Sequence, residues 1–94
     1  MGMDKKIKQS LSSVLAQMES IGEDSTVPRN IRATMSGARQ KLSGANDRES
    51  LGVMLGSVMY MLEDISSDIN MPTHTRTEIW AVISGLESIK EQLK

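Results

Sequence analysis

The residues best suited to chemistry in this chain are few, and they do not form a catalytic set. His74 is the single histidine, and it follows Pro72 where we expect the first turn of a helix, a typical surface position. The chain has no cysteine, which excludes a thiolate nucleophile, a thiolate metal site and a disulfide framework. No Ser–His–Asp set can be assembled, and no Glu-x-x-His pair provides the metal site of a helical bundle. We therefore expect no enzymatic activity, no cofactor and no metal.

Two arginines at corresponding places are candidates for anion binding. Arg32 follows Asp24 by eight residues, and Arg76 follows Asp68 by the same interval, each across a proline-containing turn. An arginine near a helix N-terminus opposes the helix dipole, so its position needs a reason. The simpler interpretation is that each aspartate pairs with its arginine and braces the turn. The alternative is an anion site that combines an arginine with free N–H groups of the helix.

A helix expected over about 72–93 offers the more specific candidate for a binding surface. At about 100° per residue, one tryptophan and several polar side chains gather to one side of its apolar stripe. Tryptophan and arginine dominate the energetics of protein–protein contacts, so this face is a candidate partner contact. The alternative is that Trp80 packs against the neighbouring hairpin and supplies the one large aromatic of the core. The candidate interaction surface consists of Thr73, Arg76, Thr77 and Trp80.

The segment 28–43 carries four basic residues and no acidic one. Such a face can contact phosphates, but backbone contacts alone give weak and salt-sensitive binding. The segment has no interleaved aromatic residues and no recognised nucleic-acid motif. A solvated face, or a complement to acids such as Glu63, Asp64 and Asp68, is the simpler interpretation. The candidate phosphate contacts of the alternative are Arg29, Arg32 and Arg39.

These residues must be positioned by helices, because apolar residues recur at three- and four-residue steps and no segment alternates with period two. The expected helices cover about 4–21, 28–43, 47–67 and 72–93. Pro28 and Pro72 suit a first helical turn. Gly44 can end the second helix in the left-handed conformation, and Asn46 or Asp47 can cap the third. Because the loops are short, successive helices should run antiparallel.

The chain reads as one helical hairpin written twice. Shifting the sequence by 44 residues against itself superposes apolar positions and brings the turns into register. The aligned pairs include Leu11 with Leu55, Met18 with Leu62, Asp24 with Asp68, Pro28 with Pro72, Arg32 with Arg76, and Leu42 with Leu86. This period and punctuation are HEAT-like, but a solenoid needs about three or more repeats. We therefore predict one all-α domain over residues 1–94, a four-helix up-and-down bundle with hairpins at about 4–43 and 47–93.

The third expected helix is apolar over an unusually wide arc. Val53, Tyr60 and Met61 lie outside its main stripe, and a helix that is apolar on most sides should be largely buried. Either it is the central helix of the bundle, or its additional face meets a second chain. Gly52 and Gly56, four residues apart, would let another helix approach closely. The hypothesis from this pattern is a homodimer through this helix.

Charge and hydropathy limit the compartment. The formal net charge is −1, so no field over the whole molecule favours nucleic acid or a membrane. The charge is uneven: residues 1–47 carry seven basic and five acidic groups, and residues 48–94 carry four and seven. The N-terminus lacks the apolar stretch of a signal peptide, and the longest uncharged run is about thirteen residues, whereas a membrane span needs about twenty. We expect a cytoplasmic protein without membrane contact.

Two motifs are similar to those of a small archaeal family that is catalogued only as an uncharacterised protein family. The first motif covers residues 25–32 and the second residues 70–80, and the similarity extends roughly from Ile7 to Leu93. The resemblance implies a four-helix bundle in an archaeal cytoplasm. It implies no activity, substrate or catalytic residue.

Together these patterns favour a protein–protein interaction module without catalytic activity. We expect it to be homodimeric and to act through the face around Trp80 and Arg76. The alternative is an accessory protein that meets RNA or DNA through the basic face of residues 28–43.

Overall fold

Four helices and no strand make up residues 3–94, the part of the chain that this computed structural model describes. The helices are α1 (Lys5–Glu23), α2 (Arg29–Ser43), α3 (Arg48–Ile65) and α4 (Thr73–Gln92). Each agrees with its predicted range to within two residues at either end. The all-α prediction is confirmed, whereas the duplication of one hairpin and its HEAT-like character stay predictions.

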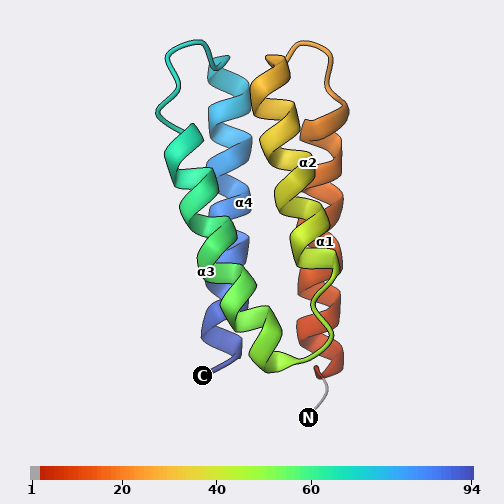
Figure 1. Ribbon diagram of the computed structural model, residues 1–94. Coiled ribbons are helices and arrows are strands. Elements are labelled where there is room, and N and C mark those ends of the chain that lie inside the picture. Colours follow the sequence, from red (N-terminus) through yellow and green to blue (C-terminus); the bar gives the residue numbers. More distant parts are fainter. Residues whose placement is uncertain (1–2) are drawn as a thin grey trace.

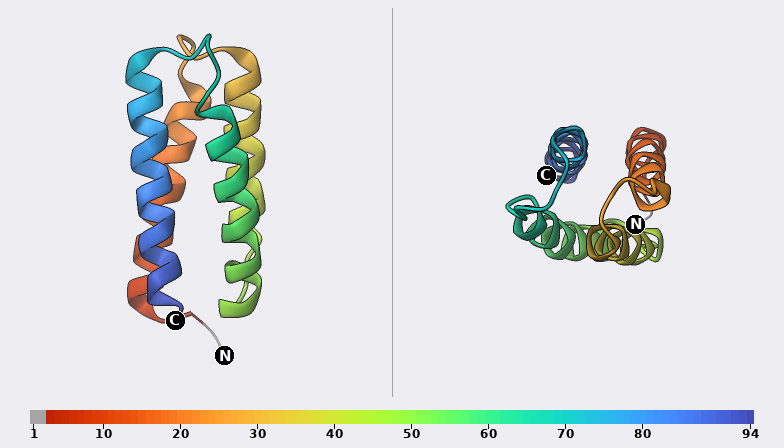
Figure 2. Two further views of the ribbon diagram at one scale, coloured as in Figure 1. Left: turned by 90° about the vertical axis from the view of Figure 1, so that its left-hand side faces the viewer. Right: turned by 90° about the horizontal axis from the view of Figure 1, so that it is seen from above.

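Successive helices run antiparallel and close into a ring (Figure 1). α1 packs against α2 and α4, and α3 packs against the same two helices. The bundle is elongated, with principal extents of 41 × 20 × 17 Å. The turns that follow α1 and α3 meet at one end, while α4 ends at the other, near the start of α1 (Figure 2).

The core lies along the bundle axis and is filled by the predicted apolar stripes. Because the chain has no phenylalanine, aliphatic and methionine side chains fill this space, and methionine adapts well to irregular gaps. Leu15, Met54, Ile65 and Leu93, which continue the expected apolar stripes at three- or four-residue steps, are only partly buried. The prediction missed five buried residues: Val27, Ala45 and Met71 in the loops, Ser66 just after α3, and Thr75 near the start of α4.

The helix ends follow the predicted capping in three places. The Asp47 carboxylate accepts from the Ser50 N–H at 2.8 Å, and the Ser50 hydroxyl oxygen accepts from the Asp47 N–H at 3.3 Å, which completes a capping box on α3. Pro28 and Pro72 directly precede α2 and α4. At the far end, Arg48 donates to the carbonyls of Gln92 and Leu93 at 3.3 and 3.1 Å, which satisfies orphan acceptors where α4 ends.

The predicted left-handed conformation of Gly44 is wrong. Its φ is −83° and its ψ is −6°, and no glycine among residues 3–94 has a positive φ. The Gly44 N–H bonds to the Lys41 carbonyl at 3.3 Å, and the Ala45 N–H bonds to the Leu42 carbonyl at 3.1 Å. This tight final turn needs no left-handed residue, because three-residue hydrogen bonds close it with ordinary dihedral angles.

Replacing Gly44 with alanine should therefore stabilise the protein. The backbone angles suit alanine, and the added Cβ would lie 3.5 Å from the Lys41 carbonyl oxygen, an ordinary contact. We expect Gly44→Ala to raise the free energy of unfolding by about 0.4–1 kcal/mol by restricting the unfolded chain. Thermal unfolding followed by circular dichroism measures the change.

Gly85 is the contrasting glycine in this experiment. A Cβ at Gly85 would lie 2.8 Å from Cγ2 of the buried Val14, so α4 passes α1 too closely for a side chain. We expect Gly85→Ala to lower the stability by about 1–3 kcal/mol through overpacking. A loss of stability in Gly44→Ala would contradict the assignment of its conformation.

Candidate interaction surface on α3 and α4

The large hydrophobic side chains left in solvent gather in the second half of the chain. Tyr60 is 75% exposed and Val53 71%, both on α3, and Trp80 on α4 is 50% exposed. Ile69, in the turn between these helices, is also exposed. Because α3 exposes Val53 and Tyr60, its interpretation as the enclosed central helix is wrong. Trp80 does not serve as the large aromatic of the core either, since half of it faces solvent.

Arg76 does not lie free on the predicted interaction surface. Its Nε donates to the Ser66 carbonyl at 3.1 Å, and its Nη2 donates to the Asp68 carbonyl at 3.0 Å. Thr73, Thr77 and Trp80 stay exposed beside it. The predicted bond to the Asp68 carboxylate is wrong, although the bracing role is right. The guanidinium supplies a donor to the Ser66 carbonyl and a second donor to the Asp68 carbonyl, which also accepts from the Met71 N–H at 3.2 Å.

Arg32 behaves in the same way in the first hairpin. Its Nε donates to the Val27 carbonyl at 2.9 Å, so the predicted pair with the Asp24 carboxylate is also wrong. Asp24 Oδ1 instead accepts from the N–H and the hydroxyl of Thr26 at 2.9 and 2.6 Å. An aspartate readily bonds to the main chain two residues later. The Asp24 carboxylate therefore bonds within its own turn instead of pairing with Arg32.

Two crossed contacts join the hairpins at this end of the bundle. Asp24 Oδ2 lies 3.7 Å from His74 Nε2, and the Asn30 side-chain amide donates to Asp68 Oδ2 at 3.1 Å. In each contact the aspartate of one hairpin's turn meets the second residue of a helix in the other hairpin. The pKa of Asp24 is lowered, first by the hydrogen bonds from Thr26 and then by the nearby charge of His74.

His74 has no catalytic geometry around it. The Thr75 hydroxyl lies 3.4 Å from His74 Nε2, the same ring nitrogen that Asp24 approaches. A catalytic triad needs the two ring nitrogens to serve different partners, and the Thr75 side chain is fully buried. Within residues 3–94, no group of three histidine, aspartate or glutamate side chains converges as a metal site.

The basic face of α2 is largely engaged with protein atoms. Arg39 forms an ion pair with Glu19 at 3.1 Å, and Lys41 donates to the Ser57 hydroxyl at 3.0 Å. With Arg32 bonded to the Val27 carbonyl, two of the three predicted phosphate contacts already bind within the chain. Arg29 is exposed at the start of α2.

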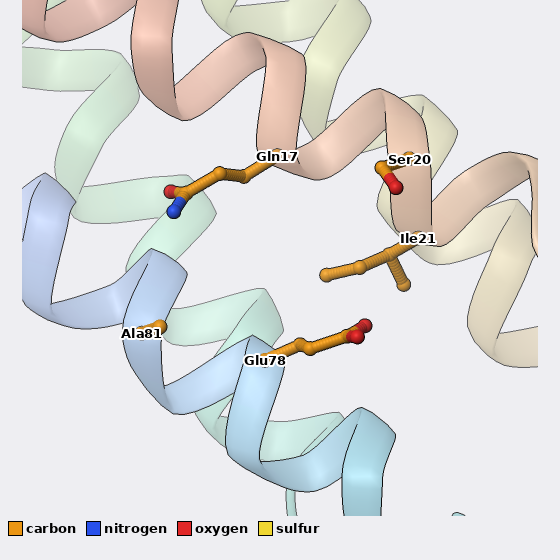
Figure 3. A pocket seen from close by; sticks show the side chains of 5 residues that line it. All are labelled: Gln17, Ser20, Ile21, Glu78 and Ala81. Atoms are coloured by element: carbon orange, nitrogen blue, oxygen red, sulfur yellow. The ribbon is translucent and has the colours of Figure 1, made fainter.

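Sequence reasoning did not identify the groove between α1 and α4. A hollow of about 210 Å³ lies at its upper part, and Figure 3 shows Gln17 and Ser20 on one side and Glu78 and Ala81 on the other. A second hollow of about 420 Å³ shares Gln17 and Ala81 with the first. Their lining is mostly small and uncharged, and Glu78 is the one ionisable residue that lines either hollow. The small residues of α4 at three- and four-residue steps were the available signal.

Comparison with known proteins decides the family. The chain matches the uncharacterised protein family UPF0147 over residues 1–89. It belongs to this family. UPF0147 proteins from Methanocaldococcus jannaschii and Archaeoglobus fulgidus are 38% and 39% identical to it, each over 93% of this chain and over 91% and 97% of their own lengths.

A solved UPF0147 structure shares the fold. The crystal structure of the family member from Thermoplasma acidophilum covers 89% of this chain and 98% of its own, with a TM-score of 0.81 and 33% identity. The predicted resemblance to a small archaeal family is confirmed. Within residues 3–94, no helix has the length and apolar character needed to cross a membrane.

The bracing role of Arg76 predicts a loss of stability on its removal. Arg76→Ala removes the side-chain donor of the Ser66 carbonyl and one of two donors to the Asp68 carbonyl, which keeps the Met71 N–H at 3.2 Å. Hydrogen bonds from a charged group contribute about 1.5–3 kcal/mol. We expect a loss of that size in urea unfolding. Arg29→Ala, which removes an exposed arginine at the start of α2, should change stability by less than about 0.5 kcal/mol. Equal effects of the two substitutions would contradict the brace.

The Asp24 turn predicts a pH-dependent contribution to stability. Because the folded-state pKa of Asp24 lies below 3.8, its carboxylate stabilises the protein above that pH, and the contribution is lost as the pH falls through the folded-state pKa. We expect the stability difference between the wild type and Asp24→Asn to be largest near neutral pH and to narrow below pH 3.8. Urea unfolding over a pH series measures it, with Asp64→Asn as an exposed control. A difference that is constant with pH would refute the assignment.

Proposed function

We propose that this protein is a small cytoplasmic protein–protein interaction module without catalytic activity. Its partner contact centres on Trp80, with Thr73 and Thr77 beside it on α4. The observation that carries the proposal is the 50% exposure of Trp80 on a helix whose opposite face is buried. A tryptophan in this position keeps apolar area in water, and burial against a partner would release that cost.

The rigidity of α4 supports this role. Its buried stripe anchors the helix in the core, and a preorganised side chain loses little conformational entropy on binding. Arg76 contributes by fixing the start of α4 through the turn carbonyls rather than by touching the partner. We therefore propose Arg76 as a positioning residue of the surface.

The proposed homodimer through α3 competes for neighbouring surface. Val53 and Tyr60 are exposed, and a Cβ at Gly56 would meet no atom within 4 Å, so the outer side of α3 is open to close approach. A second copy is thus an alternative occupant of the exposed α3 face.

The alternative function, a nucleic-acid-associated accessory protein, has weaker support. Arg32 and Arg39 already bind a carbonyl and a carboxylate, which leaves Arg29 as the one exposed residue of the three candidate phosphate contacts. A single exposed arginine contributes little of the counterion release on which nucleic-acid binding depends.

Affinity capture from the native cell extract tests the proposal. Wild-type protein should retain defined protein partners after nuclease treatment, and Trp80→Ala should lose them while its circular dichroism spectrum and unfolding stay cooperative. Mass spectrometry identifies what is retained. Arg29→Ala is the matched control and should keep the same partners.

Two outcomes of this capture would contradict the proposal. Partners that disappear with nuclease and with Arg29→Ala would favour the nucleic-acid function instead. Partners that persist unchanged in Trp80→Ala would show that the contact lies elsewhere on the molecule.

A further inference from the structure

We propose that the outer face of α3 and α4 binds a basic amphipathic segment of the partner protein. The inference rests on the proposed interaction function and adds the chemistry of the partner. The α3–α4 face is defined by Val53, Gly56, Tyr60, Glu63, Trp80 and Glu87.

The two aromatic residues lie on the two sides of one seam. A Cβ at Gly52 would lie 3.9 Å from Leu93 Cδ1, so this side of α3 faces α4. Tyr60 comes eight residues later and is rotated outward by about 80°. On α4, Arg76 reaches the Ser66 carbonyl beyond the end of α3 at 3.1 Å, and Trp80 is rotated outward from it by about 40°.

Tyr60 and Trp80 also lie at similar heights along the bundle. The antiparallel register places Gly52 beside Leu93 and Ser66 beside Arg76. These two marks place Trp80 level with residues 65 and 62 of α3, which on average is about one helical turn, or about 5 Å, from Tyr60. Two exposed aromatic side chains on neighbouring helices within one turn provide adjacent anchor points for one bound segment.

Acidic side chains lie along the seam near these anchors: Glu63 is three residues from Tyr60, and Glu87 is seven residues, or about two helical turns, from Trp80. Glu63 is eleven residues after Gly52, and Glu87 is eleven residues after Arg76, so each is rotated by only about 20° from a residue at the α3–α4 contact. Both are exposed. Of the lysines and arginines on these two helices, Lys90 alone is exposed, because Arg48 and Arg76 are half-buried and donate to main-chain carbonyls.

Gly56 leaves this face without a side chain at one position, as Gly37 does on α2. Glycine inside a helix is destabilising relative to alanine, and a Cβ at Gly56 would meet no atom within 4 Å. The packing of the chain itself therefore does not require this glycine. The absence of a side chain leaves room for a partner's apolar side chain to approach the helix between Val53 and Tyr60.

A basic amphipathic segment satisfies each of these features. Its lysine or arginine side chains pair with Glu63 and Glu87 and lie over aromatic rings, where cations are attracted to the ring face. Its apolar side chains, spaced by helical turns, meet the exposed apolar area. A second copy bound through the same face fits less well, because a two-fold contact brings like charges together.

Two synthetic peptides provide the test. Both are amphipathic 18-residue helices with the same leucine and alanine positions, and their polar positions are all lysine in one and all glutamate in the other. Trp80 is the only tryptophan of the chain, so its emission reports binding directly. We expect a saturable blue shift with the lysine peptide and none with its glutamate twin. The dissociation constant should rise at least about tenfold between 50 and 500 mM NaCl, because salt screens exposed charges.

Substitutions locate the binding face. Tyr60→Ala and the double variant Glu63→Gln with Glu87→Gln should each weaken lysine-peptide binding by about tenfold or more. Glu78→Gln is the matched control, because Glu78 lies on the same helix as Glu87 but lines the hollow against α1. It should bind within about twofold of the wild type. Equal binding of the two peptides, or equal behaviour of the double variant and Glu78→Gln, would overturn the inference.

Sedimentation without peptide identifies the competing occupant. Self-association that Tyr60→Ala abolishes, together with no peptide binding, would assign the face to a second copy and overturn the inference. If Trp80-dependent partners are captured from extract but the lysine peptide does not bind, this inference fails and the interaction function stands. If Trp80→Ala keeps its partners in the capture and the lysine peptide does not bind the wild type, both fail.

Discussion

The structure depends on burying four apolar helix stripes around one axis with a chain that has no phenylalanine. Aliphatic and methionine side chains fill the interior, and the close passage of α1 and α4 at Gly85 brings the first and last helices together. The apolar stripes occupy the interior, so polar groups of the turns bond at the end of the bundle. There Arg32 and Arg76, each on the helix that follows a turn, donate to main-chain carbonyls of that turn. The bracing arginines and the crossed contacts are consequences of this arrangement.

At the end of the bundle where the two hairpins meet, hydrogen bonds replace apolar contact as the organising interaction. Arg32 and Arg76 bind carbonyls of their own turns, and the aspartates reach across to Asn30 and His74. Each side chain has a specific partner within the chain, which gives these residues a structural role. The starts of α2 and α4 are held by the same contacts, so the position of Trp80 depends on them.

The two hairpins differ in the residues that they expose, although their buried residues are similar. Exposed large apolar residues and most unpaired acids lie on α3 and α4, whereas the exposed bases gather on α1 and α2. The core does not explain this difference in surface composition, because both hairpins bury aliphatic and methionine side chains. Exposed apolar side chains beside charges of one sign are the features on which the proposed interaction surface rests. This chain thus combines a four-helix core with one chemically distinctive face.

The amino-acid sequence by itself determined the helices, their order and nearly all of the core, because helical periodicity, prolines and capping residues act locally. It also placed Trp80 outside the apolar stripe of its helix. Tertiary structure alone decided which acceptor each arginine binds, because main-chain carbonyls become available only when the turns close. It decided that Gly44 keeps an ordinary conformation, since Ala45 is drawn into the core. It also decided that Tyr60 faces solvent, because a helix with a wide apolar arc has only two neighbours in a four-helix ring, and one side must stay uncovered.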